Sequence, residues 1–425
     1  MSINSSYKIE TPKEKQNRHK AMEAIKVINT LKDDFKNPID SMDYFYTLFE
    51  EVYCKNRSLH NNKLKVGTMC IQIPSEIIYA LDAVPIRLCN GFYTDDEIGS
   101  DFMPQKSCPL VRAIVGQFSS NNFNDKPDFV YSPTTCDQKT KAGAIIEAFG
   151  HEVVDVDFPR VKESEISREY FRRSIRNFAI DLSKKSGNKL TKTNLKKSVS
   201  KVGYAQSLYH KLCEYRKKND VVISGNDMFL ITNAFFFDAI DSWINAVEKI
   251  LKECKKREDE ALFVANKISP RVVYTGSPPI FPNYKVPLLI EQSDGIIVAD
   301  ETCSANRMFN DRVAVDEWFV NDILDSISDK YLKACTCPIF TKNHDRIRKI
   351  IELVNSFNAD GVVCQSFAGC TVYEAEQKSV LEAMEKAGIP ILYIESDYST
   401  SQSGQLSTRI EAFIESLKTR RRTKK

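Results

Sequence analysis

The chain has 425 residues, and 60 Lys and Arg against 57 Asp and Glu leave a formal net charge of +3. Balanced charge of this kind does not favour nucleic acid as a partner, because polyanion binding needs a concentrated basic face. Residues 1–20 have no apolar signal-peptide core, and no segment approaches about 18 uninterrupted apolar residues. The sequence therefore predicts a cytoplasmic protein without a membrane span.

Three regions are expected in chain order. Residues 1–64 are charged and helical in pattern, with Pro38 as an interruption, and form a helical lead-in. From residue 65, short β-branched runs such as "VPIRLC" and "DFVYSP" alternate with amphipathic helices in an N-terminal α/β lobe that extends to residue 265. Long Lys- and Glu-rich helical patterns interrupt that lobe at residues 164–265 as a helical insert.

The alternation resumes in a C-terminal lobe, residues 266–425. Its predicted strands include "GIIVAD" and "GVVCQSF", and one helix is expected around residues 313–326. Alternating strands and helices are typical of parallel sheets with crossover helices. We therefore expect an α/β fold with two doubly wound parallel-sheet lobes. The basic run "KTRRRTKK" at residues 418–425 is interpreted as a solvated, frayed tail rather than an interaction arm.

Twelve cysteines stand out in a chain expected to lie in a reducing compartment, where buried thiols, metal ligands or catalytic groups are more common than disulfides. Ligands of open α/β sheets bind beyond the carboxyl ends of the strands. Six cysteines are predicted at such places or at a helix start, where the helix dipole favours thiolate: Cys70, Cys89, Cys108, Cys136, Cys303 and Cys370. We expect them around one cleft between the lobes.

The other six cysteines have different contexts. Four lie within helical or strand patterns and are interpreted as structural: Cys54, Cys213, Cys254 and Cys364. Cys335 and Cys337 form a C-x-C pair that either ligates metal or packs near the cleft, and the sequence leaves both alternatives open. Structural zinc prefers two cysteine pairs with two to four residues between the members of each pair, and the chain has no such double pair. Widely separated cysteines suit an iron-sulfur cluster. The competing interpretation is that these are buried small hydrophobes.

Several segments together resemble a known family. They include "GTMCIQIPSEIIYALDAVPIRLCNG", "CPLVRAIVG", "TTCDQKTK", "VADETCSANR", "DGVVCQSFAGCTVYEAE" and "IESDYSTSQSGQLSTRIEAFIE". In these segments the chain resembles the 2-hydroxyacyl-CoA dehydratase and benzoyl-CoA reductase superfamily, and within it the double-cubane cluster protein branch. The resemblance runs from about residue 15 to about residue 418.

The resemblance implies two α/β lobes that hold an oxygen-sensitive iron-sulfur cluster between them. It also implies a homodimer and a separate ATP-hydrolysing iron-sulfur activator protein that supplies electrons. The dehydratase pattern of three cysteine ligands maps onto Cys108, Cys136 and Cys370. The double-cubane branch, with two linked 4Fe-4S units, needs three further ligands, which map onto Cys70, Cys89 and Cys303.

Three functions are consistent with this resemblance. The first is an ATP-dependent, low-potential reductase of small molecules at a double-cubane cluster. The second is a subunit of a 2-hydroxyacyl-CoA dehydratase, in which a single 4Fe-4S cluster and a ketyl radical lead to loss of water. The third is an electron-transfer or storage protein without turnover. The substrate is not predicted by the sequence.

Polar residues near the predicted cleft are weaker candidates, and each also has an ordinary structural interpretation. Salt bridges, helix caps or helix-surface positions would explain them as well as a role at the site. They are Glu76, Arg87, Lys106, Lys285, Arg307, Tyr373, Glu374, Glu376 and Asp397.

Overall fold

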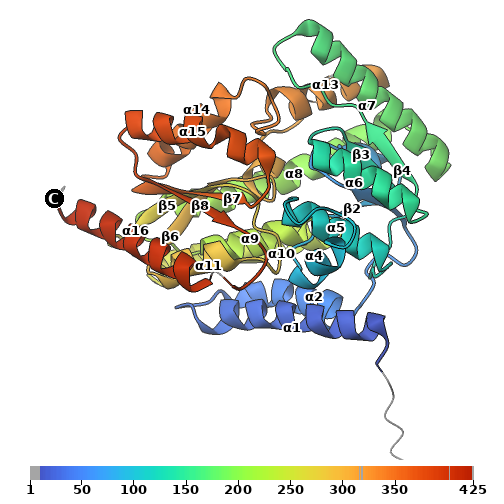
Figure 1. Ribbon diagram of the computed structural model, residues 1–425. Coiled ribbons are helices and arrows are strands. Elements are labelled where there is room, and N and C mark those ends of the chain that lie inside the picture. The colour runs from blue at the N-terminus through green and yellow to red at the C-terminus, as the bar shows by residue number, and fades with distance from the viewer. Residues whose placement is uncertain (1–9, 315, 317–318, 402, 424–425) are drawn as a thin grey trace, which may run out of the picture.

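Two four-stranded parallel sheets form the framework of the chain, in the computed structural model that describes residues 10–314, 316, 319–401 and 403–423 (Figure 1). The first sheet has the order β2 (Ala83–Arg87), β1 (Leu64–Thr68), β3 (Phe129–Pro133), β4 (Val153–Val156). The second has the equivalent order β6 (Ile296–Glu301), β5 (Arg271–Gly276), β7 (Gly361–Phe367), β8 (Ile391–Ser396). In both, the strand order reverses at the first strand, which confirms two doubly wound α/β lobes.

Helices cover both faces of the C-terminal sheet. Helices α14 (His344–Ser356) and α15 (Thr371–Lys386) lie above it in Figure 1, and α11 (Lys285–Gln292) and α16 (Ser403–Thr423) lie below. All residues of β5, β6 and β7 are buried. Such complete burial explains why each strand contains a short run of consecutive apolar residues rather than an alternation of apolar and polar ones.

The N-terminal sheet is also covered on both faces. Val130 of β3 packs in one core with residues of α5 (Pro109–Ser119) and α6 (Asp137–Ala148). Its neighbour Tyr131 points the other way and contacts Phe178 of α7 (Glu165–Ser186), with ring centroids 4.7 Å apart. Successive side chains of a strand alternate between faces, so one dipeptide joins both helix layers. Helices α3 (Ser75–Ala80) and α4 (Tyr93–Gly99) complete this lobe.

A segment of the C-terminal half crosses to the N-terminal lobe. After the short helix α12 (Asn306–Phe309), helix α13 (Val320–Lys333) packs against α7 (Figure 1). Arg172 and Arg176 of α7 pair with Asp329 and Asp325 at 3.3 and 2.5 Å. The expected helix at 313–326 is therefore misplaced, because α13 begins at Val320; residues 315, 317 and 318 lie outside the described part of the chain.

The lead-in and the insert are helical, and both pack against the lobes. The lead-in comprises α1 (Pro12–Asp33), η1 (Asp40–Met42) and α2 (Asp43–Tyr53), while its residues 1–9 lie outside the described residues. The insert adds α8 (Lys192–Lys217), α9 (Gly225–Ala234) and α10 (Ile240–Asp259). Buried residues of α1, α2, α9 and α10 share one core with the C-terminal sheet, whereas α7 and the start of α8 pack on the N-terminal one.

The basic C-terminal run does not fray as expected over its described part. Helix α16 continues to Thr423, and residues 424–425 lie outside the described residues. Arg421 pairs with Asp360 at 3.0 Å and donates to the carbonyl oxygen of Lys267 at 2.8 Å. These contacts hold the last helix to the loops below the C-terminal sheet.

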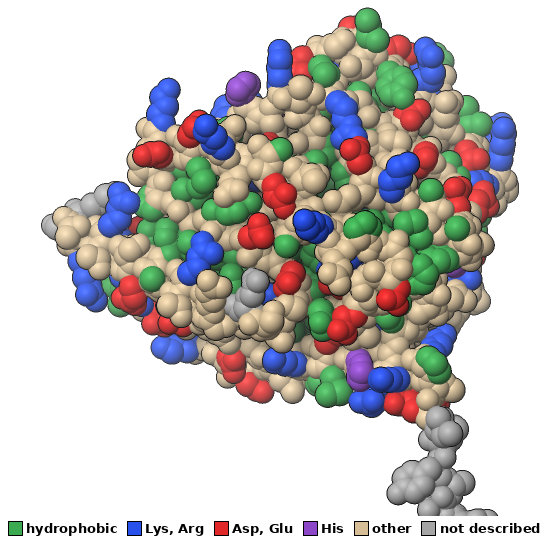
Figure 2. All heavy atoms as spheres, viewed as in Figure 1, with side chains coloured by type: hydrophobic (Ala, Val, Ile, Leu, Met, Phe, Trp, Pro, Cys, Tyr) green, Lys and Arg blue, Asp and Glu red, His purple; other side chains and the backbone are tan. Residues whose placement is uncertain are grey.

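The surface mixes positive and negative side chains. On the face shown in Figure 2, Lys and Arg lie interspersed with Asp and Glu rather than gathered by sign. Within the described part of the chain, no helix combines the length and the apolar character that a membrane span requires.

Candidate functional site

The six predicted cysteines occupy two kinds of position in the fold. Three lie two residues beyond the end of a strand, after β1, β2 and β6: Cys70, Cys89 and Cys303. Three are the N-cap residues of α5, α6 and α15: Cys108, Cys136 and Cys370. Because the carboxyl ends of parallel strands and the helices that follow them share one edge of a sheet, both lobes direct their cysteines toward the same region.

Five of the six cysteines line one cavity between the lobes. The cavity has a volume of about 760 Å³, counting space open to solvent, and its sulfur-bearing walls come from Cys70, Cys108, Cys136, Cys303, Cys337 and Cys370. Cys89 does not line it but interacts electrostatically with Cys70 and Cys303. The structure therefore brings five of the predicted cysteines to one cavity, which Cys337 also lines.

The remaining cavity walls are mostly apolar. They include Leu110 and Val111 of α5, Ile339, Phe367 and Val372. Apolar walls exclude water and lower the local dielectric, which strengthens electrostatic interactions inside.

The donor set suits a soft, multi-atom metal group. Among the described residues that line the cavity there is no Asp, Glu or His. Within the described residues, no three His, Cys, Asp or Glu side chains lie close enough to hold a single metal ion. Soft thiolates are the ligands that iron-sulfur clusters use, so the residues of this cavity fit such a group.

Several of these thiols have raised pKa values, so protons compete with metal for their sulfur atoms. Burial raises the pKa of the Cys136 thiol and raises that of Cys303 to about 12. A hydrogen bond shared with Cys108, together with burial, raises the pKa of Cys370 well above its ordinary value. These thiols are therefore protonated at neutral pH until a metal takes the place of the proton.

Lys139 places a positive charge among the thiols. It lies in the first turns of α6, three residues after Cys136, and its half-buried side chain lines the cavity. Burial acts to lower the pKa of Lys139, but the negative charges that Cys70, Cys136, Cys89 and Cys303 can carry outweigh it and raise the pKa. The lysine is therefore a built-in counter-ion for the thiolates that form when a metal takes the place of their protons.

Gln138 connects the loops that carry three of the cysteines. Its Oε1 accepts a hydrogen bond from the backbone N–H of Cys108 at 2.7 Å, and its Nε2 donates to the carbonyl oxygen of Gly369 at 2.8 Å. Gly369 has a φ of +75°, and a Cβ there would lie 1.9 Å from the carbonyl oxygen of Lys106. One side chain and one glycine thus hold the starts of α5, α6 and α15 together across the two lobes.

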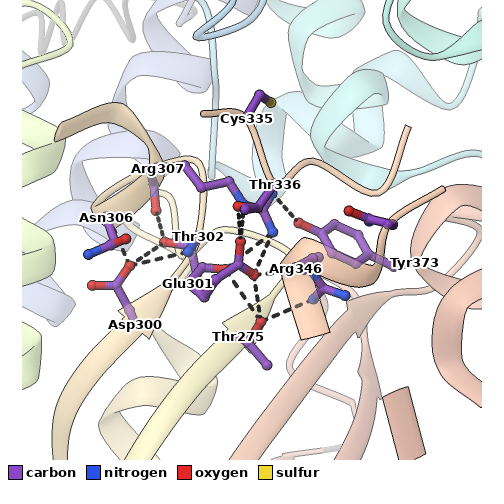
Figure 3. A network of polar contacts seen from close by, with 12 residues as sticks. Thr275, Asp300, Glu301, Thr302, Asn306, Arg307, Cys335, Thr336, Arg346 and Tyr373 are labelled. Carbon is purple, nitrogen blue, oxygen red and sulfur yellow. Dashed lines mark hydrogen bonds and ion pairs between the residues drawn. The ribbon is translucent and has the colours of Figure 1, made fainter. Parts of the chain in front are cut away.

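A buried polar network around Glu301 includes two residues of the cavity wall, Arg307 and Tyr373 (Figure 3). Glu301, at the end of β6, accepts hydrogen bonds from Arg307 and from Arg346 Nε at 3.0 Å. Burial acts to raise the pKa of Glu301, but the two guanidinium groups outweigh it and lower the pKa. Arg307 Nη1 also donates to the hydroxyl oxygen of Tyr373 at 3.0 Å, and both residues line the cavity.

The weaker polar candidates separate into two groups. Arg307 and Tyr373 line the cavity, whereas Glu76 is buried away from the thiols and accepts from Lys330 at 2.9 Å and Tyr331 at 2.8 Å. Lys106 is exposed.

Four of the remaining candidates have structural partners. Lys285 donates to the backbone oxygens of residues 397 and 399, and Asp397 accepts from the backbone of Ser399 at 3.0 Å. Glu374 accepts from the N–H of Gly369, and Glu376 pairs with Arg346. Arg87 lies beside a second cavity.

The other cysteines lie mostly where the sequence places them. Cys213, Cys254 and Cys364 are buried in α8, α10 and β7. Cys335 is buried outside the thiol cavity and accepts a hydrogen bond from Gln72 at 2.7 Å, while Cys337 lines the cavity. Between the two alternatives for the C-x-C pair, only Cys337 has access to the site.

Sequence analysis missed Lys139 and Gln138. Both lie in "TTCDQKTK", a segment singled out for its cysteine alone. Their place in the first turn of a helix that begins at a candidate ligand was the available signal, because that turn lies beside the ligand.

The chain matches the protein-family model described as 2-hydroxyglutaryl-CoA dehydratase, D-component, over residues 70–417. It is 27% identical to a putative dehydratase subunit, YjiM, of Escherichia coli (strain K12) over 357 residues, 83% of this chain and 91% of that protein. It is 20% identical to the (R)-phenyllactyl-CoA dehydratase beta subunit of Clostridium sporogenes, over 89% of this chain and all of that protein. It is 21% identical to the (R)-2-hydroxyglutaryl-CoA dehydratase, subunit beta, of Acidaminococcus fermentans, over 84% of this chain and 93% of that one. With the matched residues spanning both lobes and every one of the six cysteines, the chain belongs to the 2-hydroxyglutaryl-CoA dehydratase, D-component family.

Proposed function

We propose that this chain is a low-potential reductase of small molecules that holds a double-cubane iron-sulfur cluster in the thiol cavity. A separate ATP-hydrolysing activator protein supplies its electrons, and the chain works as a homodimer. The observation that supports this proposal is the number of thiols gathered at one place. Five predicted ligands line the cavity, and the sixth, Cys89, interacts with two of them. A single four-iron cluster needs only four ligands.

When bound, such a cluster supplies single electrons at a low potential that burial, nearby charge and hydrogen bonds to sulfur determine. The residues of this chain provide the surroundings. Leu110, Val111 and Phe367 keep water from the cavity, and Lys139 offsets the negative charge of the thiolates. Burial raises the pKa of Tyr373 well above its ordinary value, so its hydroxyl stays protonated. Because Arg307 donates to the Tyr373 oxygen, the hydroxyl proton is free for a hydrogen bond to a substrate oxygen.

A second candidate is a subunit of a 2-hydroxyacyl-CoA dehydratase with a single 4Fe-4S cluster. The relatives favour it, because two of those named above are beta subunits of such dehydratases and match most of this chain. In that case Cys108, Cys136 and Cys370 hold the cluster, and the chain works beside a different subunit. The N-cap positions of these three cysteines and the Gln138 tie between their loops fit this smaller ligand set.

Iron and sulfide counting on anaerobically purified protein separates the two functions. We expect about eight irons per chain for the double cubane and about four for the single cluster. The triple substitution Cys70→Ser, Cys89→Ser, Cys303→Ser should reduce the count by roughly half in the first case and leave it unchanged in the second. Cys254→Ser, in α10 away from the cavity, is the matched control. A protein that retains no iron after anaerobic reconstitution contradicts both.

A further inference from the structure

A second cavity lies next to the thiol cavity. Its enclosed volume is about 60 Å³, and the volume rises to about 800 Å³ when space open to solvent is counted. Three residues line both cavities and form the wall between them: Ile71, Gln72 and Arg307. A ligand in the second cavity would therefore lie beside the thiols with only this wall between.

The second cavity has a mixed lining with an apolar part. Phe235 and Phe236 follow α9, Met308 and Phe309 belong to α12, and Val202 comes from α8. Such a surface accommodates a hydrocarbon or aromatic group.

Three cations also line this cavity, and two of them already have carboxylate partners. Arg307 pairs with Glu301, and Lys330 pairs with Glu76 at 2.9 Å. The one lining carboxylate among the described residues, Asp311, is exposed and accepts from Asn310.

Arg87 is the exception. Among the described residues its side chain has no hydrogen-bond or ion-pair partner, and its Nε is buried without one. Its guanidinium lies 5.7 Å from the centroid of the Phe236 ring, and it interacts electrostatically with Cys89. An arginine held in a partly buried place without an anion is costly unless a ligand supplies one.

The wall between the cavities has a second unpaired group. Gln72 is only 2% exposed, and its Nε2 donates to Cys335 Sγ at 2.7 Å. Its Oε1 has no hydrogen-bond partner within the described structure. Buried polar atoms are normally paired, so a bound water that donates to this oxygen is expected at this point of the wall.

We propose that the second cavity binds a small organic carboxylate, with its charged oxygens on Arg87 and its apolar body against Phe236 and Met308. The planar guanidinium fork matches a carboxylate, and one unpaired cation suits a monoanion better than a phosphate dianion. The far end of the ligand then lies at the shared wall. This inference names a substrate class for the reductase. Binding of the carboxylate is independent of the proposed function, and only its reduction rests on that function.

The test is titration calorimetry of the anaerobic, iron-loaded protein with phenylacetate and with its neutral isostere phenylacetamide. We expect phenylacetate to bind roughly tenfold or more tightly than the amide, since the charged group contacts Arg87. Arg87→Gln should weaken phenylacetate binding roughly tenfold or more and leave phenylacetamide unchanged. Arg348→Gln, which removes an arginine that is 71% exposed on α14, should change neither.

A second variant tests the cavity without a substitution near Cys89, where Arg87→Gln could also change iron binding. Asn310 lines the second cavity but not the thiol cavity, and Asn310→Trp should block both ligands while iron content stays unchanged. Loaded protein that binds phenylacetate and phenylacetamide equally, or binds neither at millimolar concentration, overturns the inference and leaves the proposed function standing. Protein that binds phenylacetate through Arg87 but holds no iron overturns the proposed function and leaves this inference standing.

Discussion

The charges of Lys139 and of the thiols around it depend on one another. Neither the ammonium group nor a thiolate is favoured at this buried place without the other. Burial disfavours a charged lysine and also disfavours thiolates, since both lose hydration. Placed together, each favours the ionised form of the other. A metal that binds the thiolates displaces their protons, so its affinity should rise with pH until the thiols are ionised without it. The lysine then offsets the negative charge that the sulfurs retain.

Replacing Lys139 should change the reduction potential of the loaded protein. Lys139→Met removes a positive charge that stabilises an added electron, so we expect the reduction potential to fall by roughly 60 mV. For a one-electron couple this is about a tenfold change in the equilibrium constant of reduction. Lys141→Met is the matched control, because Lys141 is exposed on the same helix. The measurement is a redox titration followed by electron paramagnetic resonance. Equal potentials for wild type and Lys139→Met would show that the lysine does not act on the bound group.

At the scale of elements, the site depends on how three helix starts are held. The cysteines at the starts of α5, α6 and α15 come from both lobes, and local sequence places each of them correctly at a helix boundary. "SCP" and "TTCD" are recognisable helix starts because proline at the first helical position and a preceding polar turn are typical there. The side chain that joins the loops, Gln138, carries no such pattern, since its partners Cys108 and Gly369 are distant in sequence.

The two hydrogen bonds of Gln138 should contribute to the free energy of unfolding, so their removal should lower it. Gln138→Leu leaves the N–H of Cys108 and the carbonyl of Gly369 without their partner, at a cost of about 1–3 kcal/mol in the free energy of unfolding. Urea denaturation of the iron-free protein under reducing conditions measures it. Gln405→Leu, on the exposed face of α16, should stay within about 0.5 kcal/mol of wild type. An equal effect of both substitutions would mean that the tie contributes nothing.

Helix α9 is held to the C-terminal sheet by a buried carboxylate. Glu291 of α11 accepts from the N–H groups of Gly225 and Asn226, at the start of α9, at 2.8 and 3.2 Å, and from that of Ile297 in β6 at 3.2 Å. Burial outweighs these hydrogen bonds and raises the pKa of Glu291 to about 7. The carboxyl is therefore protonated in the folded chain at a pH where it is ionised in the unfolded chain.

This raised pKa predicts a pH-dependent stability. The unfolded chain releases the proton near the ordinary pKa of about 4.3, so the stabilising contribution is complete below that pH and is lost as pH rises toward 7. Glu291→Gln cannot titrate. The stability of wild type relative to this variant should therefore fall by up to about 3 kcal/mol between pH 4.5 and 7.5. Denaturant unfolding of both proteins across this range measures the difference. A difference that stays flat or grows with pH contradicts the assignment.

At the scale of the whole molecule, the pattern of strands and helices predicted both sheets, because alternation is a local signal that each segment carries by itself. The sequence did not predict how the connecting segments pack. Helix α13 follows a C-terminal strand yet lies on α7 of the other lobe, held by Arg172 and Arg176. The prediction of a frayed tail was wrong over residues 418–423, because Arg421 contacts residues in loops that are distant in sequence. Contacts of this kind depend on the assembled fold, as does the convergence of the six thiols.

The convergence of thiols from both lobes makes the implied metal group a link between them, and its removal should loosen both at once. Cys70 and Cys136 follow strands of the N-terminal sheet, and Cys303 and Cys370 follow strands of the C-terminal one. A group bound to all four resists separation of the lobes, because local opening then has to break metal–thiolate bonds.

Hydrogen exchange of the iron-loaded and the iron-free protein tests this link. We expect amides near the thiols, at residues 69–71, 134–138, 302–304 and 368–371, to exchange roughly tenfold or more slowly in the loaded protein. The amides of α1 and of the last turns of α16, which lie away from the thiol cavity, serve as the internal control. Slower exchange confined to the 134–138 and 368–371 segments, without 69–71 and 302–304, would indicate the single-cluster ligand set. Slower exchange in one lobe alone would contradict a shared site, since no group bound across both lobes can protect only one of them.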